Sequence, residues 1–326
     1  MIKRLSFDLD KTIHRLVVSL GTLMKRIRLI FLCLLVSLGV QAQGLTPIQV
    51  TDGIWAVVGP KEQRNKDNLA NNATFGVVIT EQGTVLIDPG GSYLGAKALH
   101  EVIRSLTDQP VKHVVNTGGQ DHRWLGNGYW KAQGAKIYAS DAAVKDHHTR
   151  GADQLMALER FLGTELVGTE PVYADVTFAT NFTLQVADIE LQLIHRGQAH
   201  TPGDIFVWMP KQQVMFSGDI VYVERILGTG SQSSAKSWIT VFEHMADYQP
   251  IYLIPGHGHP TDLATATRDT YDYLVNLRSQ LGALIDAGGD ILDAPQIDQS
   301  TFQYLEQFDS LAGRNAQTTF QQMEWE

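Results

Sequence analysis

Acidic and imidazole side chains stand in short loops that follow apolar, β-branched runs. Five such loops carry Asp88, the pair Asp121 and His122, His200 with Asp204, Asp219, and His257. Their oxygen and nitrogen atoms are the usual ligands of zinc in proteins, at about 2.0–2.2 Å. One such residue alone is commonly a turn former or a surface group, but five in series indicate a site assembled at several strand ends. A metal held there would lower the pKa of a bound water to about 7 and polarise a carbonyl or phosphoryl oxygen.

The apolar periodicity predicts the elements that must position these side chains. Strands are predicted at residues 48–58 (with a central turn), 74–80, 84–87, 111–116, 136–139, 172–178, 182–186, 189–195, 205–209, 213–216 and 251–254. Helices are predicted at residues 93–106, 124–133, 141–162, 237–248, 263–287 and 300–323. Strands and helices do not alternate regularly, so the pattern favours two mixed sheets packed face to face with helices outside them.

The N-terminal 42 residues have the pattern of a secretory signal peptide. Residues 24–28 form a basic region, residues 29–40 are apolar, and residues 40–42 (VQA) offer small residues at the usual cleavage positions. The apolar stretch is short for a bilayer span, so we expect cleavage after about Ala42, no stable membrane span afterwards, and export to the periplasm. Met24 is the better start than Met1 in this interpretation, and residues 1–23 would be an extension. The alternative is an uncleaved N-terminal anchor.

Charge and cysteine content exclude several classes of function. The formal charge is −9, and it becomes −14 without residues 1–42, which hold seven Lys/Arg and two Asp/Glu. Nucleic-acid binding needs a basic surface, so we expect no nucleic-acid partner. The single cysteine, Cys33, lies in the apolar stretch, so the exported chain has no thiol, disulfide or cysteine ligand.

The order of the five loops resembles the metallo-β-lactamase fold superfamily of metal hydrolases over residues 48–270. The matching segments are residues 85–88 (VLID), the loop after Asn116 and Thr117, residues 199–204 (AHTPGD), residues 216–219 (FSGD) and residues 255–258 (PGHG). The helical C-terminus is similar to the periplasmic branch near the sulfur-oxidation and quinoprotein-associated zinc hydrolases. The resemblance implies an α+β fold, an αββα sandwich of two mixed sheets flanked by helices. We expect this domain at residues 43–270, with a helical C-terminal extension at residues 271–326.

The loop that begins at residue 116 departs from the superfamily pattern. Where the family has N-T-H-x-H-x-D-H, residues 116–123 read NTGGQDHR. Aligned without gaps, Gly118 and Gln120 replace the first two histidines, and His122 and Arg123 replace the Asp and the last His. A one-residue gap before Asp121 keeps the Asp-His pair instead. In either register the resemblance leaves His200 as the only remaining ligand of the family's first metal.

The gapped register still implies one metal site. Asp121, His122, Asp219 and His257 would form a plausible four-ligand set, which His200 or a water could complete. We therefore expect one zinc ion, or none. Asp121 could instead act as the base that orients the attacking water. The resemblance places Asp88 behind the metal loop, and Asp204 and His259 are expected to support the site.

The sequence leads to two functional hypotheses. The first is a metal-dependent hydrolase that uses one zinc to cleave a small-molecule substrate in the periplasm. The second is a non-catalytic member that kept the fold, as a binding or accessory protein of a periplasmic redox pathway. Retention of the acidic and imidazole loops favours the first, whereas Gly118 and Gln120 oppose a two-metal site.

Overall fold

The computed structural model describes residues 44–326. The predicted signal peptide and start site lie outside the described residues. Within the described part of the chain, no helix is long and apolar enough to cross a membrane.

The first sheet has seven strands, in the order β1-β2-β3-β4-β5-β6-β7. The strands are β1 (Thr46–Thr51), β2 (Ile54–Val58), β3 (Thr74–Thr80), β4 (Gly83–Ile87), β5 (Val111–Val115), β6 (Lys136–Ser140) and β7 (Val176–Phe178). β1 to β4 pair antiparallel, and β4 to β7 pair parallel. The carboxyl ends of β4 and β5 therefore lie side by side, which brings Asp88 next to the loop after Asn116.

The second sheet has five strands, in the order β12-β11-β10-β9-β8. They are β8 (Asn181–Val186), β9 (Ile189–His195), β10 (Ile205–Met209), β11 (Val214–Phe216) and β12 (Tyr252–Ile254). All neighbours are antiparallel except β11 and β12, which pair parallel in the register Phe216–Ile254. Because β11 and β12 run parallel, the loops that follow them, with Asp219 and His257, leave the sheet at the same end.

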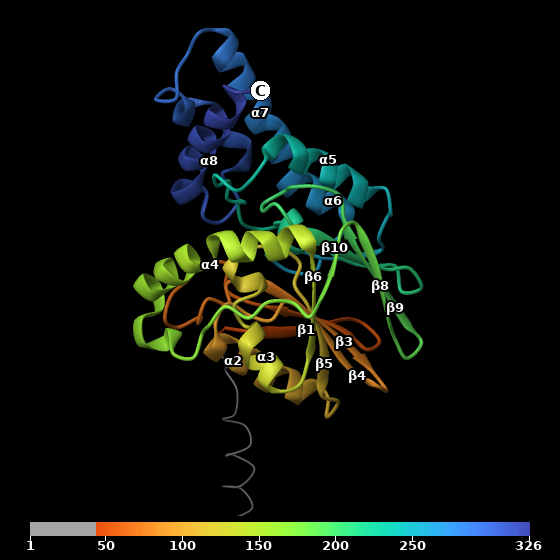
Figure 1. The fold of residues 1–326 in the computed structure, drawn as a ribbon. Coiled ribbons are helices and arrows are strands. Elements are labelled where there is room, and N and C mark those ends of the chain that lie inside the picture. The colour runs from red at the N-terminus through yellow and green to blue at the C-terminus, as the bar shows by residue number, and fades with distance from the viewer. Residues whose placement is uncertain (1–43) are drawn as a thin grey trace, which may run out of the picture. The chain divides into compact units, whose positions relative to one another are not determined.

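Helices cover the outer face of each sheet (Figure 1). The helices are α2 (Tyr93–Leu106), α3 (Asn127–Ala132), α4 (Asp141–Leu162), α5 (Ala235–Ala246), α6 (Leu263–Ala266), α7 (Asp272–Asp286) and α8 (Phe308–Met323). One apolar cluster lies between the sheets, a second joins the first sheet to α2 and α3, and a third joins the second sheet to α5, α7 and α8. This arrangement confirms the predicted sandwich of two mixed sheets flanked by helices.

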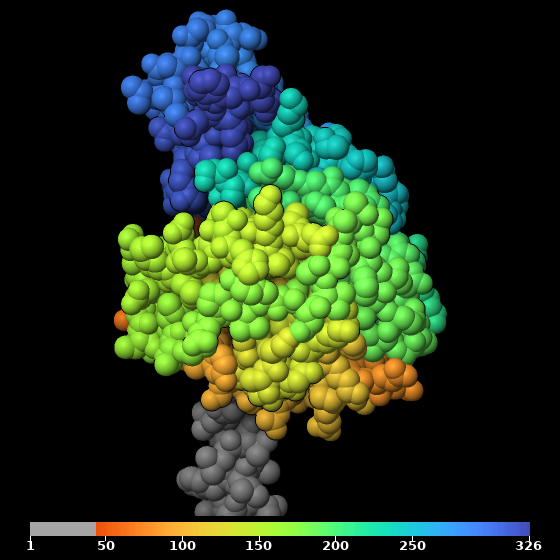
Figure 2. Space-filling view, viewed as in Figure 1, coloured from red at the N-terminus to blue at the C-terminus, as the bar shows by residue number. Residues whose placement is uncertain are grey.

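The C-terminal helices share the third cluster with the sandwich. Phe206 of β10, Trp238 of α5 and Phe320 of α8 are all buried in it. The space-filling view shows the C-terminal segment, in blue, resting directly on the teal chain around α5 (Figure 2). The one long helix predicted at residues 263–287 is divided by a π-helical stretch, Thr267–Tyr271, between α6 and α7.

Ser140 joins the start of α4 to the loop that carries His200. Its Oγ accepts a hydrogen bond from the Ala143 N–H (3.0 Å), which caps α4, and donates to the Gly203 carbonyl (2.7 Å). A Cβ on Gly203 would lie 2.0 Å from the Ala143 nitrogen. Glycine at 203 thus lets the loop that carries His200 approach the start of α4.

Candidate metal centre

Three of the predicted ligands lie close together in the loops that follow β5, β11 and β12: His122, Asp219 and His257. Nε2 of His122 lies 3.3 Å from Asp219 Oδ2, and Nε2 of His257 lies 3.2 Å from Asp219 Oδ1. One ligand atom from each residue lies within 4.8 Å of the others, and all three side chains are buried. The ring centroids of the two histidines are 5.0 Å apart. The structure thus brings together an imidazole–carboxylate–imidazole set with the spacing of a metal centre.

Asp121 lies beside this set and outside it. Residues Asp121–Arg123 form one turn of 3₁₀ helix, in which successive side chains point about 120° apart. With His122 aimed at Asp219, Asp121 turns instead to Arg64, at 2.5 Å. Burial disfavours the ionised carboxylate, but Arg64 and His122 outweigh it and hold the pKa of Asp121 well below its usual range. The structure therefore brings His122 to Asp219 and His257, whereas Asp121 faces Arg64.

Two groups compete for the second nitrogen of His122. Nδ1 lies 3.2 Å from Asp121 Oδ1 and 3.1 Å from Arg64 Nη2. When Nδ1 carries the proton, it donates to Asp121, and Nε2 keeps the lone pair that a metal needs. A carboxylate behind a ligand histidine is the common arrangement in metal sites, so Asp121 is placed to orient a ligand.

Arg123 is a site residue that the sequence pattern did not reveal as such. Its guanidinium is fully buried and donates to Asp88 Oδ2 (2.8 Å), Asp219 Oδ1 (2.7 Å) and the Gly256 carbonyl (2.7 Å). Burial alone would lower the pKa of Arg123, but the two carboxylates raise it. Arg123 thus holds the Oδ1 atom of Asp219, and the other carboxylate oxygen, Oδ2, faces His122.

Asp88 supports the loop after β5 without reaching the three ligands. It accepts hydrogen bonds from the Thr117 N–H (2.8 Å) and from Arg123. The residue adopts a left-handed backbone conformation (φ 68°), which bends the chain after β4 toward that loop.

Asp204 occupies the space beside Gly118, the residue that stands in place of the family's first histidine. A Cβ on Gly118 would lie 2.2 Å from Asp204 Oδ1, so a side chain at 118 would require the Asp204 carboxyl group to move. Asp204 accepts the Thr201 N–H (2.7 Å), and burial raises its pKa to about 8. Gln120 is half-buried at the pocket wall. The residues around Gly118 leave no set of donors for a first metal.

His200 and His259 lie apart from the three ligands. His200 is buried, and its Nδ1 donates to the Gly228 carbonyl (3.0 Å), so Nε2 keeps a lone pair. Burial lowers the pKa of His200 to about 4, which keeps the ring neutral. His259 is exposed and pairs with Glu224 at 2.8 Å, so it does not reach the site.

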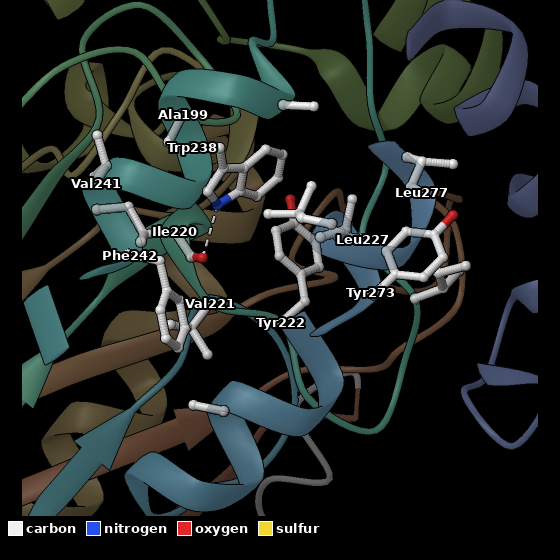
Figure 3. Close-up of a cluster of buried hydrophobic side chains, with 14 of the residues drawn as sticks. Ala199, Ile220, Val221, Tyr222, Leu227, Trp238, Val241, Phe242, Tyr273 and Leu277 are labelled. Carbon is white, nitrogen blue, oxygen red and sulfur yellow. Dashed lines mark hydrogen bonds between the residues drawn. The ribbon is translucent and has the colours of Figure 1, made fainter. Parts of the chain in front are cut away.

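A pocket of about 420 Å³ opens over His122 and His257. Its walls include His200, Tyr222, Arg64 and Arg225. Tyr222 stacks on His257, with ring centroids 4.3 Å apart and planes at 15°. Figure 3 shows Tyr222 held in the third apolar cluster near Trp238, whose indole N–H donates to the Ile220 carbonyl (2.9 Å). The packed tyrosine therefore fixes one wall and the orientation of His257.

Comparison with known proteins agrees with this architecture. The sequence profile of the metallo-beta-lactamase superfamily matches residues 70–257. The metallo-beta-lactamase type 2 of Elizabethkingia meningoseptica is 26% identical over 215 residues, which is 64% of this chain and 77% of that protein. The corresponding enzyme of Bacillus cereus is 26% identical over 190 residues, 57% of this chain and 67% of that protein.

Solved structures show the same fold. The metallo-beta-lactamase from Pontibacter korlensis superposes with a TM-score of 0.59 at 22% identity, over 71% of this chain and 99% of that one. The inverting sec-alkylsulfatase Pisa1 from Pseudomonas sp. superposes with a TM-score of 0.68 at 16% identity, over 85% of this chain. The match spans 50% of the alkylsulfatase chain, so the similarity concerns half of that enzyme.

Proposed function

The chain belongs to the metallo-beta-lactamase superfamily, and from that premise we propose that it hydrolyses a small molecule with a single bound metal ion, zinc in the first instance. Homologues in this superfamily imply metal-dependent hydrolysis. The periplasm is the proposed location, which rests on the basic, apolar and small residues of segment 24–42. The observation that carries the proposal is the buried set of His122, Asp219 and His257 below an open pocket.

The donor set fits one ion. Bonds of about 2.0–2.1 Å to a tetrahedral zinc place neighbouring ligand atoms roughly 3.3–3.4 Å apart. His257 Nε2 lies 3.2 Å from Asp219 Oδ1 and His122 Nε2 lies 3.3 Å from Asp219 Oδ2, so each histidine is at about that spacing from one oxygen of the carboxylate. Nε2 of His257 is buried and makes no hydrogen bond, although it lies near Asp219. A buried nitrogen without a partner is costly, and a cation would satisfy it.

Each of the site residues has a definable part in this function. His122, Asp219 and His257 would hold the ion, which when bound supplies Lewis acidity and an acidic water. Asp121 orients His122, and Arg123 fixes Asp219. His200 lines the pocket as a neutral imidazole whose Nε2 can accept a proton. Within residues 44–326, these three are the one group of three or more such side chains close enough together to hold a metal ion.

The test measures the metal content of the purified protein first and its hydrolytic activity second. We expect about one zinc per chain after dialysis of zinc-replete protein, measured by plasma mass spectrometry, and at least a tenfold drop in His257→Ala. His244→Ala, on the exposed face of α5, is the matched control and should keep its metal. The metal-loaded protein should hydrolyse one of a panel of β-lactams, sulfate esters, carboxylic esters, thioesters and phosphoesters.

One observation favours a second candidate function, a binding or accessory protein of a periplasmic redox pathway. Arg225 Nη1 lies 3.4 Å from Nδ1 of His257, and an arginine can only donate there. That contact favours the tautomer with the proton on Nε2, which is unsuited to a metal. Zinc well below stoichiometric in the wild type would support this second candidate and contradict the hydrolase.

A further inference from the structure

The two histidines of the metal centre are oriented in different ways. Behind His122, the carboxylate of Asp121 lies 3.2 Å from Nδ1 and can accept its proton. His257 has no such acceptor among residues 44–326, because its Nδ1 contacts Nη1 of Arg225 at 3.4 Å and a guanidinium can only donate. A histidine that binds a metal through Nε2 presents an N–H at Nδ1, which Arg225 cannot accept. A different contact must therefore orient the ring of His257.

Tyr222 provides that contact. Its ring stacks on the imidazole of His257, with centroids 4.3 Å apart and planes at 15°. The two residues also form an isolated backbone bridge, and the Val223 N–H donates to the His257 carbonyl (3.0 Å). Tyr222 is buried, and Trp238 packs beside it, with ring centroids 6.1 Å apart (Figure 3). Stacked rings favour an offset parallel geometry, so a fixed Tyr222 restrains the tilt of the imidazole.

Thr270 fixes the backbone of Tyr222. Its hydroxyl donates to the Tyr222 carbonyl (2.6 Å) and accepts the Tyr222 N–H (2.9 Å). Thr270 is fully buried in the π-helical stretch Thr267–Tyr271, and such stretches are frequent at functional sites. The preceding residue, Asp269, accepts the Glu224 N–H (3.0 Å). Two consecutive side chains of the π-helical stretch therefore hold the segment on which Tyr222 lies.

We propose that Thr270 is a positioning residue of the metal centre, which through Tyr222 holds the ring of His257 in the orientation that binds the ion. The hydroxyl of Thr270 sets the backbone of Tyr222, and the ring of Tyr222 sets the imidazole. Metal affinity should then depend on a hydroxyl in a helical stretch that contributes no ligand. The proposal rests on the metal binding of the proposed function, but the orientation of His257 is measured without metal, so the two can fail separately.

The experiment compares Thr270→Val, which fills the same space without the hydroxyl, with Thr270→Ser, which keeps the hydroxyl. Nuclear magnetic resonance spectra of chelator-treated protein with carbon-labelled histidine follow the ring signals of His257, which the ring current of Tyr222 shifts. The spectrum of His257→Ala assigns these signals. We expect them to move in Thr270→Val and to stay near their wild-type positions in Thr270→Ser.

Zinc affinity is the second readout, measured by competition with a chelating dye. Loss of a group that orients a ligand typically weakens metal binding, so we expect affinity about tenfold weaker or more in Thr270→Val and within about threefold of the wild type in Thr270→Ser. Thr319→Val is the matched control. Thr319 is buried in α8, and within residues 44–326 its hydroxyl has no hydrogen-bond partner. This control should keep both the His257 signals and the zinc affinity of the wild type.

Two results would overturn the proposal. Thr270→Val with the His257 signals and zinc affinity of the wild type would leave Thr270 a residue of the fold alone, and equal losses in Thr270→Val and Thr270→Ser would show that the hydroxyl is not responsible. If Thr270→Val does not fold, Tyr222→Leu replaces it: this variant lacks the stacked ring, and unchanged zinc affinity would equally overturn the proposal. A wild type that binds no zinc would contradict the metal-dependent function, while the spectra would still decide whether Thr270 positions His257.

Discussion

The planar guanidinium of Arg123 donates hydrogen bonds to four segments of the chain. It reaches the Thr74 carbonyl at the start of β3, Asp88 after β4, Asp219 after β11 and the Gly256 carbonyl after β12. All of these groups are acceptors, and two of them are buried carboxylates. A lysine at 123 could not bridge them, because an ammonium lacks the planar fork.

We therefore expect Arg123→Met to be strongly destabilising. The substitution leaves Asp88 and Asp219 buried without a cation, a situation that typically costs about 3–5 kcal/mol in the free energy of unfolding. Urea denaturation followed by circular dichroism measures the loss. Lys211→Met removes an exposed pair with Asp188 and should cost less than about 1 kcal/mol. Equal effects of the two substitutions would contradict the role given to Arg123.

Asp204 provides the second prediction at the scale of one residue. Burial raises its pKa to about 8 in the folded state, against an ordinary value of 3.8. Between these two values the unfolded chain ionises Asp204 and the folded chain does not, so its contribution to stability falls as pH rises from about 4 to about 8. Below pH 4 both states are protonated, and the effect vanishes.

Asp204→Asn should remove that dependence. An asparagine can still accept the Thr201 N–H and cannot ionise, so the variant should gain stability relative to the wild type as pH rises, by roughly a few kcal/mol at pH 8. Melting temperatures of both proteins from pH 4 to pH 8 measure the difference. A constant difference across that range would show that Asp204 is ionised in the folded protein.

At the scale of elements, α8 holds the segment that forms one side of the pocket. Asn315 of α8 donates to the Leu227 carbonyl (2.8 Å) and accepts the Thr229 N–H (2.9 Å). Residues 228–232 next to these contacts line the pocket. The C-terminal helix therefore shapes the site although it contributes no ligand to the metal centre.

Asn315→Leu should loosen this segment. The substitution leaves the Thr229 N–H and the Leu227 carbonyl without their partners, at a cost of about 1–3 kcal/mol for each buried group. Amide hydrogen exchange should rise in residues 227–232 first, before exchange in β10 changes. Asn276→Ala, which removes an exposed bond to the Asp298 carbonyl, is the control and should leave that segment protected. Unchanged exchange in residues 227–232 would mean that α8 does not hold them.

At the scale of the whole molecule, the fold could be predicted from the sequence because its signals are local. The bounds of α2 and α4 follow from apolar spacing and match the structure, in which Ser92 and Ser140 cap the two helices. His122, Asp219 and His257 could be found because each follows an apolar strand. The arginines could not: Arg64 meets Asp121 across 57 positions, and Arg225 meets His257 across 32. Such pairing depends on how distant loops fold together, which neither periodicity nor spacing encodes.

The last prediction concerns the boundary between residues 270 and 271, where the sequence predicts that the helical C-terminal extension begins. Tyr273, Leu277, Leu311 and Phe320 are buried in the same cluster as Phe206 and Trp238. Removal of residues 271–326 would expose that shared apolar surface, so the shortened chain should be insoluble or lack a cooperative thermal transition, whereas the chain from residue 43 should unfold in one transition by both tryptophan fluorescence and circular dichroism. A control chain that lacks only Trp325, which is 88% exposed, and Glu326 should unfold within about 1 kcal/mol of the full chain. Cooperative unfolding of the chain that ends at residue 270 would instead establish residues 271–326 as a separable extension.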